Sequence, residues 1–335
     1  MTRAFISGCA GTSLSAEEKA FLREARPWGA ILFRRNVESR EQLRALTVEI
    51  REQLGAEAPI LVDQEGGRVQ RLAPPHWRAY PSAAAFARIG LDAAATARLV
   101  RLGARLIAHD LHEVGVDVDC LPVLDTPCDG AHDVIGDRAY CRDPAEIARL
   151  GRAAAEGLLA GGVLPVIKHV PGHGRARADS HKELPVVEAS RAELEERDFQ
   201  PFRADADLPL AMTAHVVYTA IDPERPGTLS PVVIGDIIRG LIGFNGLLMT
   251  DDLSMKALTG SFRDRAEAAI RAGCDMVLHC NGALDEARAV AEGAGDLDGR
   301  ALERARAALA RRVAPEDFDP VDGARELDAA LAATA

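Results

Sequence analysis

Short apolar runs recur along the chain, and most gaps between them carry a helical pattern. Each run is rich in β-branched residues or ends in a polar residue, which is typical of strands, including strands buried on both faces. Such runs predict eight strands, at Ala4–Ser7, Ala30–Phe33, Ile60–Asp63, Val116–Asp119, Leu164–His169, Leu208–His215, Leu247–Asp251 and Asp275–Cys280.

The gaps hold apolar residues at positions i, i+3 and i+4, the spacing that places them on one face of a helix. Ser15 and Ser190 stand before acidic first turns and are expected to cap two of these helices. The predicted helices are Ala16–Arg26, Arg40–Leu54, Ala93–Val114, Pro144–Leu159, Arg191–Asp205, Pro231–Leu241 and Arg263–Ala272.

Strands that alternate with helices pair in parallel through right-handed crossovers. Eight of them fit an α/β fold of one closed (β/α)8 TIM barrel better than an open sheet, and no Gly-x-Gly-x-x-Gly motif follows the first strand. No linker rich in Pro, Gly or Ser divides the chain, so we expect one catalytic domain over residues 1–335. Its C-terminal part, about residues 297–335, is expected to hold the closing helices Arg300–Val313 and Arg325–Ala335.

The charge balance narrows the class of partner. With 40 basic and 51 acidic residues the net charge is −11, which argues against binding to nucleic acid or to anionic lipid. No run approaches the roughly 20 apolar residues of a transmembrane helix, and the stretch before Cys9 is too short for a signal peptide. The six cysteines include no Cys-x-x-Cys pair. We therefore expect a cytoplasmic monomer with reduced thiols and a small-molecule partner.

Several predicted strands end in charged or polar residues. In a barrel, the carboxyl ends of the strands form the floor of the active site. Any one of these residues could instead cap a following helix or turn. Their convergence at the same end of several strands favours a functional site. The residues are Asp63, Asp119, Lys168, His169, His215, Asp251 and Asp252.

The segment Lys168–His181 is the densest in such groups, with three histidines, one lysine and one aspartate. One interpretation is a metal site built from His169, His173 and His181, although an intervening Pro-Gly pair prevents the helix that would align the first two. The other is acid/base chemistry. Asp179 lies two residues before His181 and can orient and charge-stabilise its imidazole.

Two further segments carry carboxylates. Strand alternation points the side chains of Asp251 and Asp252 to opposite faces, so one should face the barrel mouth and the other should cap a helix starting near Leu253. Periodicity does not say which. The pair Gly66-Gly67 allows a tight turn that brings Asp63 and an arginine into one pocket. A carboxylate beside a guanidinium suits sugar hydroxyls, which both donate and accept hydrogen bonds.

With these residues in view, the sequence resembles the single-domain, NagZ-type β-N-acetylglucosaminidases of glycoside hydrolase family 3, over nearly the whole chain. The Lys-His-x-Pro-Gly-His-Gly…Asp-Ser-His stretch is the most specific feature, since it marks the hexosaminidase branch. The segments that carry the resemblance are Asp63–Arg71, Val134–Tyr140, Lys168–His181, Met212–His215 and Thr250–Met255.

The resemblance implies a TIM barrel and hydrolysis without a metal or another cofactor. It also implies that Asp251 is the nucleophile, which resolves the choice between the two adjacent aspartates. His181 is implied to be the general acid/base, with Asp179 as its partner. The positions implied to bind the sugar are Asp63, Arg71, Arg138, Lys168 and His169.

The implied reaction is retaining removal of a terminal N-acetylglucosamine from muropeptides, in which the sugar is joined to a 1,6-anhydro-N-acetylmuramyl peptide, during cell-wall recycling. A glycosyl-enzyme would form on Asp251. Three alternatives stay open: phosphorolysis of the same substrates, a metal-dependent barrel hydrolase that uses the His169/His173/His181 loop, and a sugar-binding protein without a catalytic role.

Overall fold

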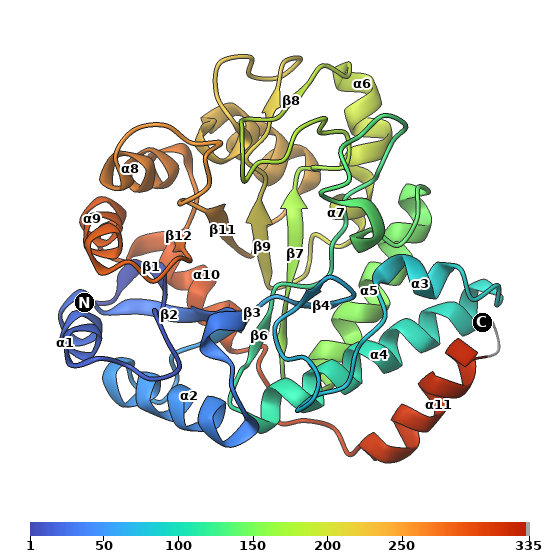
Figure 1. Cartoon of the computed structure of the whole chain (residues 1–335). Helices are drawn as coiled ribbons and strands as arrows, with labels where there is room; N and C mark the ends of the chain where they lie inside the picture. The colour runs from blue at the N-terminus through green and yellow to red at the C-terminus, as the bar shows by residue number, and fades with distance from the viewer. Residues whose placement is uncertain (333–335) are drawn as a thin grey trace.

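A closed barrel of eight parallel strands forms the centre of the protein, as the computed structural model of residues 1–332 shows (Figure 1). Around the barrel the strands follow the order β1-β12-β11-β9-β7-β6-β3-β2. Each corresponds to one predicted strand, so the predicted (β/α)8 barrel is confirmed. The strands are β1 (Arg3–Gly8), β2 (Pro27–Leu32), β3 (Ile60–Val62), β6 (Val118–Asp119), β7 (Leu164–Val170), β9 (Leu210–Thr213), β11 (Leu247–Asp252) and β12 (Met276–His279).

The strands are buried on both faces because alternate side chains enter two different apolar clusters. Ile6 and Leu61 belong to the cluster that fills the barrel, together with residues of the other strands. Phe5, Ile60 and Val62, one position away on the same strands, pack against the surrounding helices. This double burial explains why the strands read as continuous apolar runs in the sequence.

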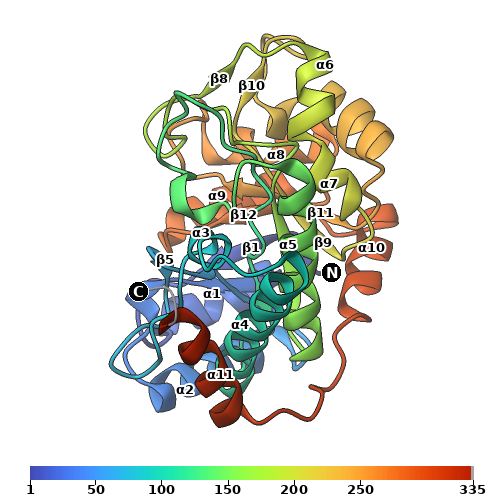
Figure 2. The same ribbon diagram turned by 90° about the vertical axis from the view of Figure 1, so that its right-hand side faces the viewer.

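Helices cover the outside of the barrel (Figures 1 and 2). Ser15 caps the first of them through a reciprocal hydrogen-bonding pair with Glu18, as its sequence context predicts. The helices that match predicted ones are α1 (Ala16–Ala25), α2 (Arg40–Leu54), α4 (Ala93–Glu113), α5 (Pro144–Ala160), the π-helix η5 (Val233–Ile242), α8 (Phe262–Ala272), α10 (Gly299–Leu309) and α11 (Pro320–Ala332).

The predicted helix Arg191–Asp205 is interrupted. It consists of α6 (Arg191–Glu193), which Ser190 caps, a π-helical turn η3 (Leu194–Asp198) and α7 (Gln200–Ala204). Pro201 stands at the start of α7, where its missing N–H breaks the continuous ladder of helical hydrogen bonds.

Helix α9 (Leu284–Ala294) was not predicted. Its buried face is made of Ala287, Val290, Ala291 and Ala294, and three small alanines give a weak apolar pattern. Of the two predicted closing helices, α10 packs near β11 and α11 lies along α4. The last three residues of the predicted helix Arg325–Ala335 lie outside the described residues.

Short elements shape the mouth of the barrel. Gly66 and Gly67 both adopt positive φ and form the predicted tight turn, between β4 (Gln64–Gly66) and β5 (Val69–Gln70). Beyond the mouth, β8 (Val186–Val187) pairs with β10 (Val217–Tyr218), which ties the loop after β7 to the segment after β9. The remaining short helices are α3 (Ala83–Ala87), η1 (Arg34–Asn36), η2 (Gly136–Arg138) and η4 (Gly227–Leu229). Within residues 1–332, no helix has the length and apolar character needed to span a membrane.

Candidate active site

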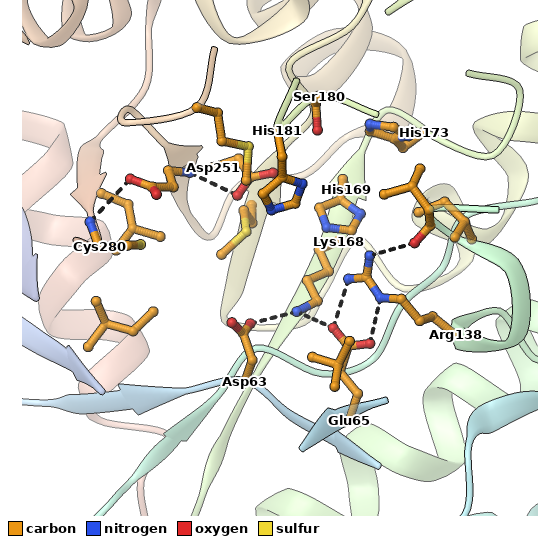
Figure 3. Close-up of a pocket in the computed structure, with 18 of the residues that line it drawn as sticks. Asp63, Glu65, Arg138, Lys168, His169, His173, Ser180, His181, Asp251 and Cys280 are labelled. Atoms are coloured by element: carbon orange, nitrogen blue, oxygen red, sulfur yellow. Dashed lines mark hydrogen bonds and ion pairs between the residues drawn. The ribbon is translucent and has the colours of Figure 1, made fainter. Parts of the chain in front are cut away.

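A cavity of about 290 Å³ opens at the carboxyl ends of the barrel strands (Figure 3). The strand-end residues of β3, β7 and β11 meet there, because parallel strands of a barrel deliver their last residues to the same rim. Of the catalytic and sugar-binding residues that the resemblance implies, Asp179 alone lies outside the lining, and it contacts His181. Of the other polar strand ends, Asp252 also lines the cavity, whereas Asp119 and His215 are fully buried outside it. The predicted residues that line the cavity are Asp63, Arg71, Arg138, Lys168, His169, His181 and Asp251.

A network of alternating charges occupies one side of the cavity (Figure 3). The Nζ atom of Lys168 lies 2.9 Å from Asp63 Oδ1 and 2.7 Å from Glu65 Oε1. Arg138 donates two hydrogen bonds of 2.8 Å to the two oxygens of Glu65. Arg71 Nη2 donates to Asp63 Oδ2 over 2.9 Å. Asp63 and Glu65 therefore each have two cationic partners, which offset the free-energy cost of burying a carboxylate.

The pKa values of these groups follow from their neighbours. Burial raises the pKa of the Glu65 carboxyl, but the charges of Arg138 and Lys168 outweigh it and hold that pKa at about 2. At Asp63, burial is likewise outweighed by Lys168 and Arg71, and the pKa is held well below its ordinary range. The two carboxylates raise the pKa of the Lys168 amine in spite of its burial. All three groups are thus charged at neutral pH.

A second buried network holds His169 and the first turn of the loop after β7. Asp125, which is completely buried, accepts a hydrogen bond from the His169 ring, with 2.6 Å between Oδ2 and Nδ1. Its other oxygen, Oδ1, accepts the backbone N–H of His173 over 2.6 Å. Burial lowers the pKa of the His173 imidazole to about 4, so this ring is neutral at physiological pH.

Asp251 and Asp252 differ in their surroundings, as strand alternation predicts. Asp251 ends in the cavity, where its Oδ1 accepts only the backbone N–H of Asp252, over 2.8 Å. The side chain of Asp252 instead accepts the backbone N–H groups of Ser254 and Cys280, over 3.0 and 3.1 Å. The expected helix near Leu253 is absent: this segment is a turn, which Asp252 caps, and α8 begins only at Phe262.

The environment of Asp251 keeps its carboxyl ionised. Burial raises its pKa, but His169, His215 and the N–H of Asp252 together lower the pKa below the ordinary value. His215 is itself fully buried, and its Nε2 donates to the carbonyl of Asp252 over 3.0 Å. His215 therefore supports the backbone that carries Asp251.

Asp179 and His181 form the predicted pair on the loop of residues 171–185, hereafter the β7–β8 loop. The His181 Nδ1 atom lies 2.8 Å from Asp179 Oδ1, and the same oxygen accepts the His181 backbone N–H over 3.0 Å. The His181 side chain is 60% exposed, which leaves its Nε2 free to meet a substrate at the cavity mouth (Figure 3). Burial raises the Asp179 pKa, but its two bonds to His181 lower it overall.

The geometry of the histidines favours hydrogen bonding over metal ligation. His169 and His181 direct Nδ1 to Asp125 and Asp179, and the His173 backbone N–H donates to the same Asp125 that contacts His169. Among residues 1–332, no group of three or more His, Cys, Asp or Glu side chains is arranged to hold a metal ion.

Sequence reasoning missed two residues of this site, Glu65 and Asp125, and it gave a third, His215, no role. Glu65 lies inside a segment that the sequence analysis singled out, between Asp63 and the Gly-Gly turn, so its position was a usable signal. Asp125 does not end a predicted strand, and nothing in the sequence around it indicated a role in the site. His215 ends a predicted strand and was noted only for that position.

The comparisons with known proteins agree with this geometry. Residues 7–313 match the family described as Glycosyl hydrolase family 3 N terminal domain, which is most of the chain. The chain belongs to glycoside hydrolase family 3. It is therefore a glycoside hydrolase, and the predicted family resemblance is confirmed.

Curated relatives named beta-hexosaminidase place this family 3 hydrolase in the β-hexosaminidase group. It is 44% identical over 280 residues to a beta-hexosaminidase of Alkalilimnicola ehrlichii, covering 82% of this chain and 80% of that protein. A beta-hexosaminidase of Bordetella avium is 40% identical over 277 residues, covering 81% and 79%.

Solved structures agree with the fold over 99% of the chain. Native NagZ from Neisseria gonorrhoeae superimposes with a TM-score of 0.85 at 34% identity, covering 99% of this chain and 97% of that chain. The same Neisseria protein has been solved in complex with N-trifluoroacetyl-D-glucosamine, with a TM-score of 0.85 and 33% identity over the same shares of each chain.

Proposed function

We propose that this β-hexosaminidase is a retaining exo-β-N-acetylglucosaminidase with Asp251 as its nucleophile. The observation that carries the proposal is an ionised, nearly unpaired carboxylate at the wall of a cavity whose mouth holds a His–Asp pair. Asp251 accepts one hydrogen bond from its own backbone neighbour, so most of its oxygen lone pairs are free to attack. The ligand in the Neisseria neighbour, an N-acylated glucosamine, supports the choice of sugar.

The first step is attack of Asp251 on the anomeric carbon, while protonated His181 donates its Nε2 proton to the leaving oxygen. A glycosyl-enzyme and the free aglycone result. In the second step, neutral His181 takes a proton from water, and the water oxygen displaces Asp251. Asp179 holds the imidazole by Nδ1 and stabilises its cationic form, so the ring presents Nε2 in both steps.

The charged side of the cavity would bind the sugar. Asp63, Lys168 and His169 offer acceptors and donors for hydroxyl groups, as does Arg71. Arg138 donates three hydrogen bonds, two to Glu65 and one to the Val134 carbonyl over 3.2 Å, which leaves two of its five N–H groups for the sugar. The cavity ends on this charge network, an arrangement that suits a terminal sugar and hence exo action.

The natural substrate that we propose is a muropeptide with N-acetylglucosamine on 1,6-anhydro-N-acetylmuramic acid, hydrolysed in the cytoplasm by a monomeric enzyme. The sequence resemblance, the acidic charge and the shared β-hexosaminidase name support this assignment.

The test compares 4-nitrophenyl β-glycosides of N-acetylglucosamine and glucose, with wild type and Asp251→Ala. We expect preference for the N-acetylated sugar and a loss of at least about 1000-fold in kcat for Asp251→Ala, because the covalent route is removed. Loss of turnover in Asp251→Ala, with N-acetylglucosamine still bound by the variant, would exclude a protein that only binds sugar. NMR should show the β-anomer as first product, and an inverted product would refute the nucleophile.

Phosphorolysis is a second candidate, favoured by one observation: the acid/base candidate is an imidazole and not a carboxylate. A neutral imidazole repels an incoming phosphate dianion less than an ionised carboxylate does. Adding phosphate to the assay decides the matter, since sugar 1-phosphate would form in place of free sugar. Activity that survives exhaustive chelation would exclude the metal-dependent alternative.

A further inference from the structure

Asp125 is a fully buried carboxylate that no step of the proposed reaction uses. It lies between β6 and η2, and it accepts three hydrogen bonds. Two come from His169, through the ring Nδ1 over 2.6 Å and the backbone N–H over 3.3 Å. The third comes from the backbone N–H of His173 over 2.6 Å. A buried carboxylate with this many donors has a defined orientation.

The three donors belong to two different parts of the site. His169 lies at the end of β7, whereas His173 lies near the start of the β7–β8 loop that carries the Asp179–His181 pair, and both line the cavity. Their two rings also contact each other edge to face, with 5.8 Å between centroids. Asp125 therefore joins the sugar-binding side of the cavity to the root of the loop.

Two further contacts hold the loop root, which comprises residues 171–174. The carbonyl of Gly172 accepts the Tyr218 hydroxyl over 2.9 Å. A Cβ atom at Gly174 would lie 2.1 Å from the carbonyl oxygen of Thr126, the residue after Asp125. The backbone of the loop root thus packs directly on the segment that holds the carboxylate, with no room to shift toward it.

We propose that Asp125 is a positioning residue, which fixes the ring orientation and the tautomer of His169 and at the same time anchors the root of the β7–β8 loop. A carboxylate only accepts hydrogen bonds, so the Nδ1 of His169 must carry a proton and its Nε2 must face the cavity. The inference rests on the proposed function, because it assigns His169 a role in binding the sugar.

Asp125→Asn separates the two parts of this role. The amide oxygen can still accept the His173 N–H, which keeps the loop anchored. The amide NH₂ then faces the His169 ring, and it forces Nδ1 to become an acceptor and moves the proton to Nε2. The side chain keeps its shape while the tautomer of His169 reverses.

A double-mutant cycle with His169→Ala tests the proposal through kcat/KM on 4-nitrophenyl N-acetyl-β-glucosaminide. Losing a hydrogen bond to a charged carboxylate predicts that Asp125→Asn alone lowers kcat/KM by about 10- to 100-fold. In the His169→Ala background, the same change should cost less than about 2-fold, since its target is gone. Equal losses in both backgrounds would overturn the proposal. An inactive wild type would instead refute the proposed function.

Asp205→Asn is the matched control. Asp205 is also a buried, ion-paired carboxylate, with 2.8 Å to Arg152, but it lies outside the cavity. We expect its kcat/KM to stay within about 2-fold of wild type.

A direct measurement reads the tautomer of His169 in the wild-type protein. The ¹⁵N chemical shifts of the His169 ring should show that Nδ1 carries a proton. The His169 signals are assigned as those that disappear from the spectrum of His169→Gln. A wild-type spectrum with the proton on Nε2 alone would overturn the proposal.

Discussion

The buried amine of Lys168 is the centre of the charge network, and Lys168→Met tests whether that network stabilises the fold. The lysine side chain is 2% exposed and bridges Asp63 and Glu65, whose side chains are 16% and 4% exposed. Methionine fills a similar volume but leaves two carboxylates without their shared cation. Asp63 keeps its ion pair with Arg71, and Glu65 keeps its ion pair with Arg138. The variant therefore weakens the pairing of both carboxylates but leaves neither without a cation.

The expected loss of folding free energy follows from the ion pairs that are lost and kept. Removing one partner of a buried ion pair costs about 3–5 kcal/mol, and the remaining arginines place this case near 3 kcal/mol. With an unfolding entropy of about 2.1 cal/mol/K per residue, a chain of this length loses roughly 4 °C in Tm. Lys19→Met is the control, because Lys19 pairs with Glu49 at the surface, where an ion pair contributes at most about 1 kcal/mol.

The assay is differential scanning calorimetry at one scan rate, at pH 5 and pH 8. The Glu65 pKa is held at about 2, far below its unfolded value, so its contribution is present above about pH 4.3 and is lost only as the pH falls toward 2. The Tm difference between wild type and Lys168→Met should therefore be equal at both pH values. A difference below about 1 °C, or one that vanishes at pH 5, would refute the reasoning.

Three other variants test the site and its surroundings. His181→Ala should lower kcat at least about 100-fold without a measurable change in Tm, because the side chain is 60% exposed, and retained turnover would contradict its acid/base role. Gly174→Ala should lower kcat at least about 10-fold, because its Cβ would meet the Thr126 carbonyl at 2.1 Å. Gly235→Ala, where a Cβ meets nothing within 4 Å, is the control that should keep full activity. Burial raises the pKa of Asp205 to about 7, above its unfolded value near 4. The native state then binds the proton more tightly, so stability falls as the pH rises from about 4 to 7. Asp205→Asn should flatten this slope in urea unfolding, and an unchanged slope would show that the carboxyl titrates normally.

Much of the fold could be predicted because its signals are local. A strand buried on both faces is apolar at every position, and an amphipathic helix repeats its apolar residues every turn, so both patterns are visible within a few residues. Helix α9 was not predicted because its buried face is mostly alanine, which gives a weak apolar pattern. The interruption near Pro201 escaped because the apolar period continues across it.

The candidate site was partly predictable for a geometric reason. Once a barrel is inferred, all strand ends meet at one rim, which brings Asp63, Lys168 and Asp251 together although they are far apart in sequence. Asp125 contacts His169 across 44 residues, and nothing near it in the sequence indicates that contact. Only the folded backbone decides which buried carboxylate meets which ring.

The sequence by itself therefore determined the barrel, the strand ends that surround the cavity and the family to which the chain belongs. The tertiary structure decided how the charges pair: that Glu65 joins Lys168 to Arg138, that Asp252 caps a turn while Asp251 enters the cavity, and that Asp125 holds both His169 and the β7–β8 loop. The physical reason is the distance along the chain between the residues that interact. Burial periodicity is written into neighbouring residues, whereas hydrogen bonds within about 3 Å depend on where distant segments meet.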